Sequence, residues 1–398
     1  MRTISRTLIF LSFCILFFGC HKNDSPPPKP PVANAGSDQT IQLPASSLTL
    51  AGSGTTESGT IISYAWTLVS GPNVPTINNA TSATTSVSGF ITGTYVFQLK
   101  VINSSGLSAI DTVTIIVTPA PLPPVANAGP DQTIQLPASS FALSGSGTTA
   151  SGTITGYMWS LVSGPNVPTI NTQTSASTSV TGFTAGTYVF QLQVTNSFGL
   201  SGTDNVTIVL NPTTLTLQPA NNNANEINLA VIGSTDGSSH NIDLDAGAWT
   251  TGGAPTYLRG AFKFDLSGIP AGATIISAKL SLYSIPDPTN GDGINANSGT
   301  NNAMYIRRIT SNWSGNTVTW QTQPATTTTD QLLIPHTNQS FLDLTDLDVK
   351  NLVDAMHTSG NYGLMMILQN ETAYTIRQFC SSNHSNAAKH PKLVIVYQ

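Results

Sequence analysis

The sequence contains two nearly identical copies of one segment, and this repeat restricts the chain to a tandem arrangement of like domains. The pentapeptide VANAG occurs at residues 32–36 and again at residues 125–129. Trp66 recurs as Trp159, which sets the offset at 159 − 66 = 93 residues. Later residues keep this offset, so no insertion separates the copies. Both copies must therefore fold on one plan.

Each copy consists of short runs of alternating apolar and polar residues, separated by Gly, Pro, Asn and Ser. The first copy contains the runs TIQLP, SLTLAGSG, SYAWTLVSGP, TTSVSGF, GTYVFQLKV and DTVTIIV. Alternation with a period of two and frequent turn residues is typical of a β-sandwich. We therefore expect sandwiches at residues 32–118 and 125–211. The prolines of residues 119–124 predict a stiff joint between them.

The copies resemble PKD-type domains of the Ig-like superfold. The resemblance rests on A-N-A-G-x-D-Q-T, on one Trp per copy, and on G-T-Y-V-F-Q-L-x-V before an Asn-Ser turn. In place of the W-D-F-G-D-G form, residues 66–72 read WTLVSGP, which is similar to the REJ-like branch. Each Trp lies in an alternating strand, so we expect it to pack between two sheets, with sugar stacking as the alternative. Tandem copies this similar favour a spacer role.

Two aspartates in each copy leave two interpretations open. These are Asp38 and Asp111 in the first copy, and Asp131 and Asp204 in the second. Their carboxylates either hold a calcium ion at the edge of the domain or accept hydrogen bonds from backbone N–H groups of turns.

Residues 1–20 read as a bacterial lipoprotein signal peptide. A positively charged start precedes an apolar run at residues 8–18 that is too short to span a bilayer. The segment ends in FFGC, which resembles a lipobox with Cys20 as the acylated residue. Residues 21–31 are a Pro-rich tether. We expect an outer membrane lipoprotein exposed at the cell surface, which contacts the membrane through its lipid anchor only. An ordinary secretory signal is the alternative.

Charge and cysteine content bear on the function class. The net charge is −5 and only 8% of residues are charged, so no basic surface for nucleic acid is expected. The sequence has no spaced histidine pair, nucleophile elbow or phosphate loop, and we expect no enzymatic activity. Cys380 lies near His384, which leaves the thiol as either a nucleophile beside a base or a small core hydrophobe.

Two strands joined by a tight turn stand out in the remaining third of the chain. One face of the first strand is apolar and carries Leu258, Gly260, Phe262, Phe264 and Leu266. The other face carries Tyr257, Arg259, Ala261, Lys263 and Asp265. Residues 267–272 read SGIPAG, which is turn chemistry. A second strand follows at about residue 278, and the alternation predicts that both strands are half-buried.

This strand pair resembles the central motif of DNRLRE-type domains, also grouped as carbohydrate-binding module family 96. The motif F-D-L-S-x-I-P-x-G-A-x-I-x-S-A-K-L-x-L-Y lies at residues 264–283. Further matching motifs lie at residues 313–320, 361–363, 379–381 and 391–397. The resemblance covers residues 213–398 and implies a jelly-roll domain that binds carbohydrate. Family members differ in ligand, so the sugar stays open.

The remaining pattern of this region predicts one helix among strands. Apolar residues at helical spacing place the helix at residues 346–356, with Thr345 or Asp346 as its cap. Residues 247–255 are expected to form a flexible connection. The chain as a whole is expected to be all-β, with two tandem Ig-like β-sandwiches followed by a jelly-roll β-sandwich with one short helix.

Aromatic and cationic side chains are the candidates for carbohydrate binding, because aromatic faces contact sugar C–H groups and planar donors bind hydroxyls or carboxylates. The candidates are Trp249, Tyr257, Arg259, Lys263, Arg307 and Arg377. Cations clustered on a sheet face of an acidic protein favour an anionic polysaccharide. The alternative is that they are ordinary strand charges that prevent edge pairing.

A long loop at residues 286–302 is the candidate for a metal site. Asp287, Asn290 and Asp292 offer oxygen ligands for a hard cation such as Ca²⁺, although their spacing is not that of an EF-hand. A solvated turn-rich loop is the alternative, and no other cofactor is expected.

These features lead to one function and one alternative. The first is a lipid-anchored surface protein whose two sandwiches form a stalk and whose terminal domain binds a polysaccharide. The second is a surface adhesin or structural protein that binds a protein partner, since the same layout would serve it.

Overall fold

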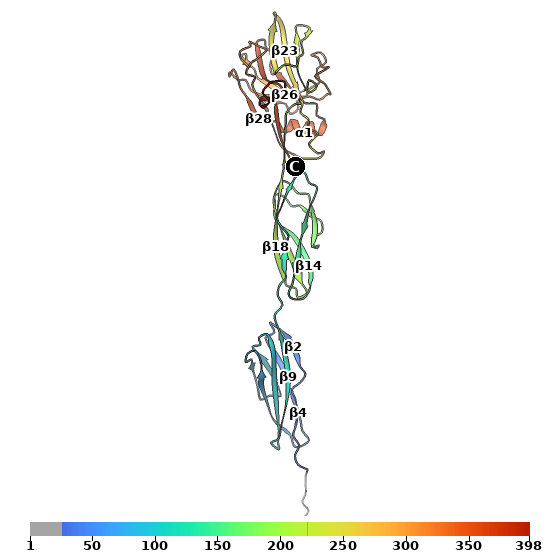
Figure 1. Cartoon of the computed structure of the whole chain (residues 1–398), viewed down its shortest axis with the longest axis vertical. Coiled ribbons are helices and arrows are strands. Elements are labelled where there is room, and N and C mark those ends of the chain that lie inside the picture. Colours follow the sequence, from blue (N-terminus) through green and yellow to red (C-terminus); the bar gives the residue numbers. More distant parts are fainter. Residues whose placement is uncertain (1–25, 221) are drawn as a thin grey trace, which may run out of the picture. The chain divides into compact units, whose positions relative to one another are not determined.

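The computed structural model describes residues 26–220 and 222–398, and almost all of its regular structure is β-strand (Figure 1). The expected signal peptide and Cys20 lie outside the described residues. The chain divides into two compact units, with the division between Leu122 and Pro123. The first unit holds the first copy of the repeat, and the second holds the second copy and the C-terminal domain.

The first copy forms a sandwich of two antiparallel-rich sheets. One sheet has the strand order β2-β9-β8-β5, from β2 (Gln39–Gln42), β9 (Ser108–Thr118), β8 (Gly93–Asn103) and β5 (Ile61–Ser70). The other has the order β3-β7-β6, from β3 (Ser47–Ala51), β7 (Thr84–Ser88) and β6 (Thr76–Ile77). A short pair joins β1 (Val32–Asn34) to β4 (Ser53–Thr55). These strands confirm the expected Ig-like sandwich.

The second copy repeats this topology strand for strand. Its larger sheet has the order β11-β18-β17-β14, from β11 (Gln132–Gln135), β18 (Ser201–Asn211), β17 (Gly186–Asn196) and β14 (Ile154–Ser163). Its smaller sheet has the order β12-β16-β15, from β12 (Phe141–Ser144), β16 (Ser177–Thr181) and β15 (Thr169–Ile170). The short pair joins β10 (Val125–Asn127) to β13 (Ser146–Thr148).

One tryptophan lies at the centre of each sandwich core. Trp66 is buried, and its Nε1 donates to the carbonyl of Ala83 at 3.1 Å. Trp159 makes the equivalent bond to Ala176 at 3.2 Å. Gly52 leaves room for the first ring, because a Cβ there would lie 2.7 Å from Trp66 Cζ2. The core position predicted for both rings is confirmed.

The paired aspartates of each copy hold backbone N–H groups. Asp111 Oδ2 accepts from Ala35 N at 2.7 Å, and Asp204 Oδ2 accepts from Ala128 N at 2.8 Å. Asp38 Oδ1 accepts from Thr114 N at 2.7 Å, and the second copy repeats this bond with its own aspartate. Each carboxylate therefore joins two segments that are far apart in sequence. Of the two interpretations, calcium binding and acceptance of hydrogen bonds from backbone N–H groups, the second describes this geometry.

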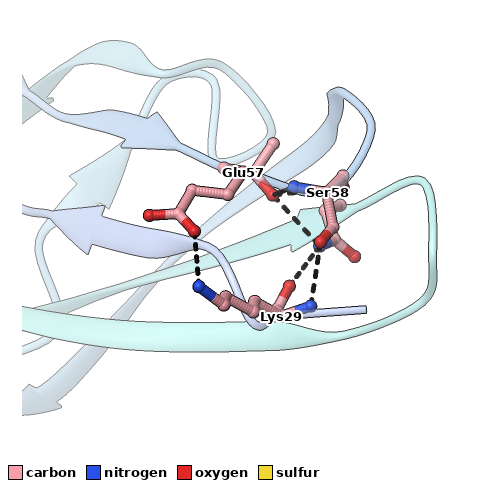
Figure 2. Close-up of polar contacts among 5 residues, drawn as sticks. Lys29, Glu57 and Ser58 are labelled. Carbon is pink, nitrogen blue, oxygen red and sulfur yellow. Dashed lines mark hydrogen bonds and ion pairs between the residues drawn. The ribbon is translucent and has the colours of Figure 1, made fainter. Parts of the chain in front are cut away.

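The described end of the Pro-rich tether lies against the first sandwich. Lys29 Nζ forms an ion pair with Glu57 at 2.7 Å, and Lys29 N donates to Ser58 Oγ at 2.9 Å (Figure 2). Asn103 Nδ2 donates to the carbonyl of Lys29 at 3.0 Å. The ion pair is exposed and contributes little by itself, so the two backbone bonds place this residue. The second copy has Ala150 where the first has Glu57.

Only Pro212 separates the second sandwich from the C-terminal domain, because β18 ends at Asn211 and β19 (Thr213–Leu217) begins just after that proline. Gln135 Nε2 donates to the carbonyls of Asn211 and Pro212, at 3.1 and 2.8 Å. Ala185 N donates to Gln398 Oε1 at 2.6 Å. These bonds fasten both sides of the junction.

The C-terminal domain is a curled β-sandwich with one α-helix. Its smaller sheet has the order β19-β31-β24-β28, from β31 (Lys392–Tyr397), β24 (Ile275–Leu282) and β28 (Leu344–Asp348) besides β19. The path of its larger sheet is β25-β30-β22-β23-β29-β26-β27, from β25 (Asn297–Ser298), β30 (Thr375–Cys380), β22 (Asp243–Thr251), β23 (Ala254–Phe262), β29 (Leu364–Leu368), β26 (Met304–Arg308) and β27 (Leu332–Ile334). Off this path, β20 (Glu226–Ile232) pairs with β23 and with β21 (Thr235–Asp236).

The predicted alternation of the first hairpin strand is confirmed. Phe262, Phe264 and Leu266 are buried in the core between the two sheets, although β23 itself ends at Phe262. The expectation of a flexible connection at residues 247–255 is wrong. These residues complete β22, turn at Gly252 and Gly253, and begin β23, because the two glycines adopt positive φ and close a hairpin.

The helix lies later in the chain than its pattern predicted. α1 runs from Lys350 to Ser359, whereas residues 346–348 belong to β28. Asp346 has a φ of 55° and Val349 is the N-cap, so the predicted capping by Thr345 or Asp346 is wrong. Pairing of β28 with β24 takes precedence over helix propensity there.

We predict that Asp204→Ala in the full-length chain loosens the second sandwich only. Loss of a charged hydrogen bond should lower local stability by about 2 kcal/mol, which hydrogen exchange should detect as lost protection at residues 125–129. Asp111→Ala is the matched variant and should affect residues 32–36 instead. Unchanged protection in both variants would show that the carboxylates do not hold these segments.

Candidate functional site

The larger sheet of the C-terminal domain places three of the predicted side chains on one face. Ala261 in β23 lies opposite Met365 in β29, which in turn lies opposite Arg307 in β26. Directly opposed residues project to the same side of a sheet, and every second residue shares that side. Tyr257, Arg259 and Arg307 therefore share a face.

Trp320 lies on this face and contacts two of these residues. Its ring stacks on that of Tyr257 with centroids 6.2 Å apart. The guanidinium Cζ of Arg259 lies 4.7 Å from its centroid, within the range of a cation–π interaction. The segment that follows β26 thus covers part of the face that the sequence indicated as solvent-exposed.

Arg259 is held by two further partners. Its guanidinium forms an ion pair with Glu371 at 2.8 Å, and its Nη1 donates to Gln323 Oε1 at 2.8 Å. Both partners of the ion pair are about a quarter exposed. Arg259 is therefore an oriented donor whose charge is already balanced.

Arg307 forms a second cation–aromatic pair two strands away. Its Cζ lies 4.9 Å from the ring centroid of Tyr305, and its Nε donates to Gln331 Oε1 at 2.8 Å. In the part of the chain that the structure describes, no ion pair is recorded for Arg307. With β29 between them, β23 and β26 are about 10 Å apart. We call Tyr257, Arg259, Tyr305, Arg307 and Trp320 the Trp320 face.

Lys263 lies beside this face, over the ring of Trp313. Lys263 Nζ lies 5.9 Å from the ring centroid of Trp313. Trp313 is buried, and its Nε1 donates to the carbonyl of Tyr362 at 2.6 Å. It packs with Ile227, Leu229 and Met365 in a small second core, which lies on the same side of the sheet as this face.

Trp249 lies apart from the Trp320 face. It is opposite Thr256, whereas Tyr257 is opposite Ala248, so the two aromatic side chains project to opposite sides of β22 and β23. Trp249 instead meets the exposed Tyr374 edge to face, with centroids 5.3 Å apart. The structure therefore does not bring Trp249 together with the other candidates.

Arg377 does not project to solvent as the sequence analysis expected, and this expectation is wrong. The residue is completely buried, its Nη1 donates to the carbonyl of Pro335 at 3.2 Å, and burial lowers its pKa to about 10. Alternation along a strand shows which face of the sheet a residue lies on, but it does not show whether another segment covers that face. Arg377 is a structural residue in this fold.

The three candidate metal ligands of the long loop are not gathered into one site. Asp292 is exposed. Desolvation opposes its ionisation, but several hydrogen bonds, among them those from Asn295 and from Ile294 N, together lower its pKa. Asn290 points elsewhere, toward Asp245, with its Nδ2 2.6 Å from Oδ2. Asp287 is exposed in the same loop. No metal binding follows from these positions alone.

Three carboxylates are buried in the larger sheet, and the sequence analysis singled out none of them. Burial raises the pKa of Glu226 to about 7, although Ser382 donates to it. Burial also raises the pKa of Asp243. The pKa of Asp245 is well above its usual value because of burial and the neighbouring Asp243. In the sequence these residues alternate with apolar ones, as solvent-facing positions of a half-buried strand do, so no local pattern marked them as buried.

The described residues contain no arrangement that indicates catalysis. Within these residues, no group of three or more His, Cys, Asp or Glu side chains is placed to hold a metal ion. Cys380 is buried, its thiol faces the carbonyl of Ser284, and burial raises its pKa to about 11. His384 accepts a hydrogen bond from Asn386 N at 3.1 Å. The core interpretation of Cys380 fits these contacts.

We predict that Cys380 does not react in the native chain. A buried thiol with a pKa of about 11 is almost entirely protonated at neutral pH, and the thiolate is the reactive form. Mass spectrometry after treatment with iodoacetamide should find Cys380 unmodified in the native protein and modified in denaturant. Rapid native labelling that His384→Ala abolishes would instead indicate an activated nucleophile.

Comparison with protein families finds matches to three segments of the chain. Residues 35–117 and 128–210 match the family of PKD domains named for the KIAA0319-like protein, and residues 218–397 match carbohydrate-binding module family 96. The chain therefore consists of two PKD domains of the KIAA0319-like type followed by a carbohydrate-binding module, as the motifs implied. The Trp320 face lies entirely within that module.

Curated relatives are similar over about the length of the PKD pair. The dyslexia-associated protein KIAA0319-like protein of Mus musculus is 36% identical over 184 residues, which are 46% of this chain and 18% of that protein. The dyslexia-associated protein KIAA0319 of Homo sapiens is 38% identical over 184 residues, which are 46% of this chain and 17% of that protein. The chain spans less than a fifth of the length of these curated relatives.

Solved structures of single PKD domains also match. The solution structure of the PKD domain from KIAA 1837 protein is 38% identical and covers 23% of this chain and 89% of that one, with a TM-score of 0.22. The PKD domain of human KIAA0319 is 26% identical and covers 23% of this chain and 84% of that one, with a TM-score of 0.21.

Among the described residues, no helix is long and apolar enough to cross a membrane.

Proposed function

We propose that this chain is a lipid-anchored cell-surface protein that binds a polysaccharide through its C-terminal module. The observation that supports the polysaccharide is the Trp320 face, which carries two arginine–aromatic pairs. Their arginines belong to β23 and β26, two strands of one sheet that a single strand holds about 10 Å apart. An extended row of contacts suits a chain of sugars better than a single small sugar. The PKD domains serve as a spacer.

The chemistry of the face matches what sugar rings offer. Trp320 and Tyr305 present aromatic surface to sugar C–H groups, and the arginines present planar N–H donors to hydroxyls or carboxylates. Trp320 is held by Tyr257 and Arg259, so little side-chain freedom is lost when a ligand binds. A preorganised ring of this kind favours measurable affinity from a small contact area.

Charge on this face supports an anionic polysaccharide. Arg259 is neutralised by Glu371, but Arg307 is held by the neutral Gln331. Lys263 adds a second cation beside Trp313. A carboxylated or sulfated sugar would supply Arg307 with the counter-charge that no ion pair recorded among the described residues provides, and such binding would weaken as salt increases.

The proposed anchor is Cys20, with acyl chains holding the protein in the outer membrane and the sandwiches extending the module away from it. Support comes from the sequence of residues 1–20, which lie outside the described residues. At least two acyl chains are needed for stable attachment, and a lipid-modified N-terminal cysteine can carry them.

We predict that Trp320→Ala in the full-length chain weakens polysaccharide binding at least about tenfold, which corresponds to about 1.4 kcal/mol. The matched control is Trp249→Ala, which removes the same ring from the opposite face and should leave affinity unchanged. Isothermal titration with neutral and uronic acid polysaccharides provides the measurement. Equal losses for both variants would refute the assignment of the binding face.

Arg307→Gln tests the charge component separately. We predict that it reduces affinity for an anionic polysaccharide and flattens the dependence of affinity on salt, because one ionic contact is lost. Lys392→Gln, whose cation lies over Tyr283 in the region of the smaller sheet, is the control and should change neither. Identical binding of neutral and anionic polysaccharides by the unmodified chain would contradict the proposed preference.

The anchor has its own test. In cells that express the protein, a radioactive or alkyne-labelled fatty acid should be incorporated into the unmodified chain and not into Cys20→Ser. The variant should also leave the membrane fraction. Release of an unlabelled mature protein would favour an ordinary secretory signal.

A second function, adhesion to a protein partner, is favoured by one observation. The KIAA0319 proteins are similar to this chain over 184 residues, about the length of the PKD pair, so a role of the PKD domains beyond spacing has support. In this case, capture of a partner from cell surfaces should survive enzymatic removal of glycans and should require the PKD domains. Loss of capture after glycan removal would favour the first function.

A further inference from the structure

Two aspartates lie next to each other on β22, in the interior of the C-terminal domain. Asp243 and Asp245 are separated by one residue and are 1% and 0% exposed. A Cβ on Gly260 would lie 3.1 Å from Asp245 N, so the glycine allows β22 to pass close to β23 at this point. The two carboxylates are therefore enclosed by the sheet on one side and by the 286–302 loop on the other.

Neutral side chains surround both carboxylates. Asn290 Nδ2 lies 2.6 Å from Asp245 Oδ2 and 3.5 Å from Asp243 Oδ2. Asn228 Nδ2 lies 3.2 Å from Asp243 Oδ1 and 3.3 Å from Asp245 Oδ2. Thr289 Oγ1 donates to Asp243 Oδ2. The oxygens of the two carboxylates thus converge on the same small space.

The charge in this space is not balanced by the described residues. The ion pairs recorded among them involve neither Asp243 nor Asp245. Asp245 Oδ1 is buried and has no hydrogen-bond partner. A buried carboxylate that lacks a cation and leaves one oxygen unpartnered is strongly disfavoured, so this arrangement requires either a proton on a carboxyl group or a cation between the two.

The two asparagines differ in how firmly their amides are oriented. Asn228 Oδ1 accepts from Asp245 N at 2.8 Å, so its Nδ2 must face the carboxylates. For Asn290, no hydrogen bond to Oδ1 is recorded among the described residues, and the oxygen and nitrogen of an amide are assigned from such bonds. Rotation of the Asn290 amide by half a turn places its oxygen beside Asp245.

We propose that Asp243 and Asp245, together with Thr289 and Asn290, bind a Ca²⁺ ion. Two carboxylates match the charge of a divalent cation, and a set made only of oxygens, with an amide and a hydroxyl, is the type that Ca²⁺ prefers. Water completes the coordination on the side of the loop. Asn290 was a candidate in the sequence, but its partners come from β22 and not from Asp287 or Asp292.

The ion has a structural role at this place. Gln378 in β30 holds the backbone of Asn290 from both sides, accepting from its N–H at 3.2 Å and donating to its carbonyl at 3.1 Å. The metal would add a link from the same residue to β22. It therefore fastens the 286–302 loop to the larger sheet, through residues that the Trp320 face does not share.

The first experiment compares the full-length chain with Ca²⁺ and after removal of divalent cations by EDTA. Isothermal titration with CaCl₂ should show one binding site, and Ca²⁺ should raise the Tm of the C-terminal domain by about 5 °C at concentrations well above Kd. Limited proteolysis should cut the 286–302 loop faster in EDTA. Absence of both binding and stabilisation would overturn the proposal.

Variants distinguish the proposed site from a site in the exposed part of the 286–302 loop. Asp245→Asn should abolish the Ca²⁺-dependent rise in Tm while leaving the protein in EDTA at least as stable as the unmodified chain, because it removes an unbalanced charge. Asn290→Ala changes a residue outside the strands, so this variant should fold normally and should bind Ca²⁺ about tenfold more weakly. Asp292→Asn is the matched control and should bind Ca²⁺ like the unmodified chain.

The opposite pattern would refute the proposal. If Asp292→Asn loses Ca²⁺ while Asn290→Ala and Asp245→Asn retain it, the ion belongs to the exposed part of the loop. Polysaccharide binding by Asn290→Ala serves as a separate readout, since the Trp320 face lies on other residues. Its persistence with loss of Ca²⁺ binding supports a structural ion and leaves the proposed function unaffected.

Discussion

The pairing of β23 with its neighbouring strands determines which side chains lie on each face of the larger sheet. β20 pairs along one edge of β23, while β22 and β29 share the other edge. This pairing fixes which residues project outward, so Tyr257 and Arg259 meet Trp320, and Arg307 lies in the row beyond Met365. A shift of one residue in register would exchange these side chains for Leu258 and the buried aromatic residues.

The sequence was informative wherever one pattern dominated. The repeat predicted two like sandwiches, and the core positions of Trp66 and Trp159 followed from alternation. It was less informative where the exposure of a residue depends on a distant segment that covers the sheet. Arg377 and Arg259 have the same alternating context, yet one is enclosed and the other reaches the surface, because segments far away in the sequence cover Arg377 completely and Arg259 only in part. Strand pairing of residues 346–348 likewise displaced the predicted helix start.

The sequence analysis missed two kinds of residue. Trp320 contacts Arg259 only because the segment after β26 folds over the sheet of β23, whereas Tyr305 and Arg307 are two residues apart on β26, a local pairing that was overlooked. Asp243 and Asp245 looked like ordinary polar positions of a half-buried strand. Their environment depends on Asn228 and Asn290, which come from two other segments, so no local pattern predicts it.

The single residue between the second sandwich and the C-terminal domain has a mechanical consequence. β19 begins directly after Pro212 and pairs antiparallel with β31 along its whole length, from Thr213 to Leu217. Tension that enters the module at Thr213 and runs along β19 acts parallel to the strand. The interstrand hydrogen bonds between β19 and β31 are then loaded together in shear and do not open one after another. The strand pair at the start of the module therefore resists separation under tension.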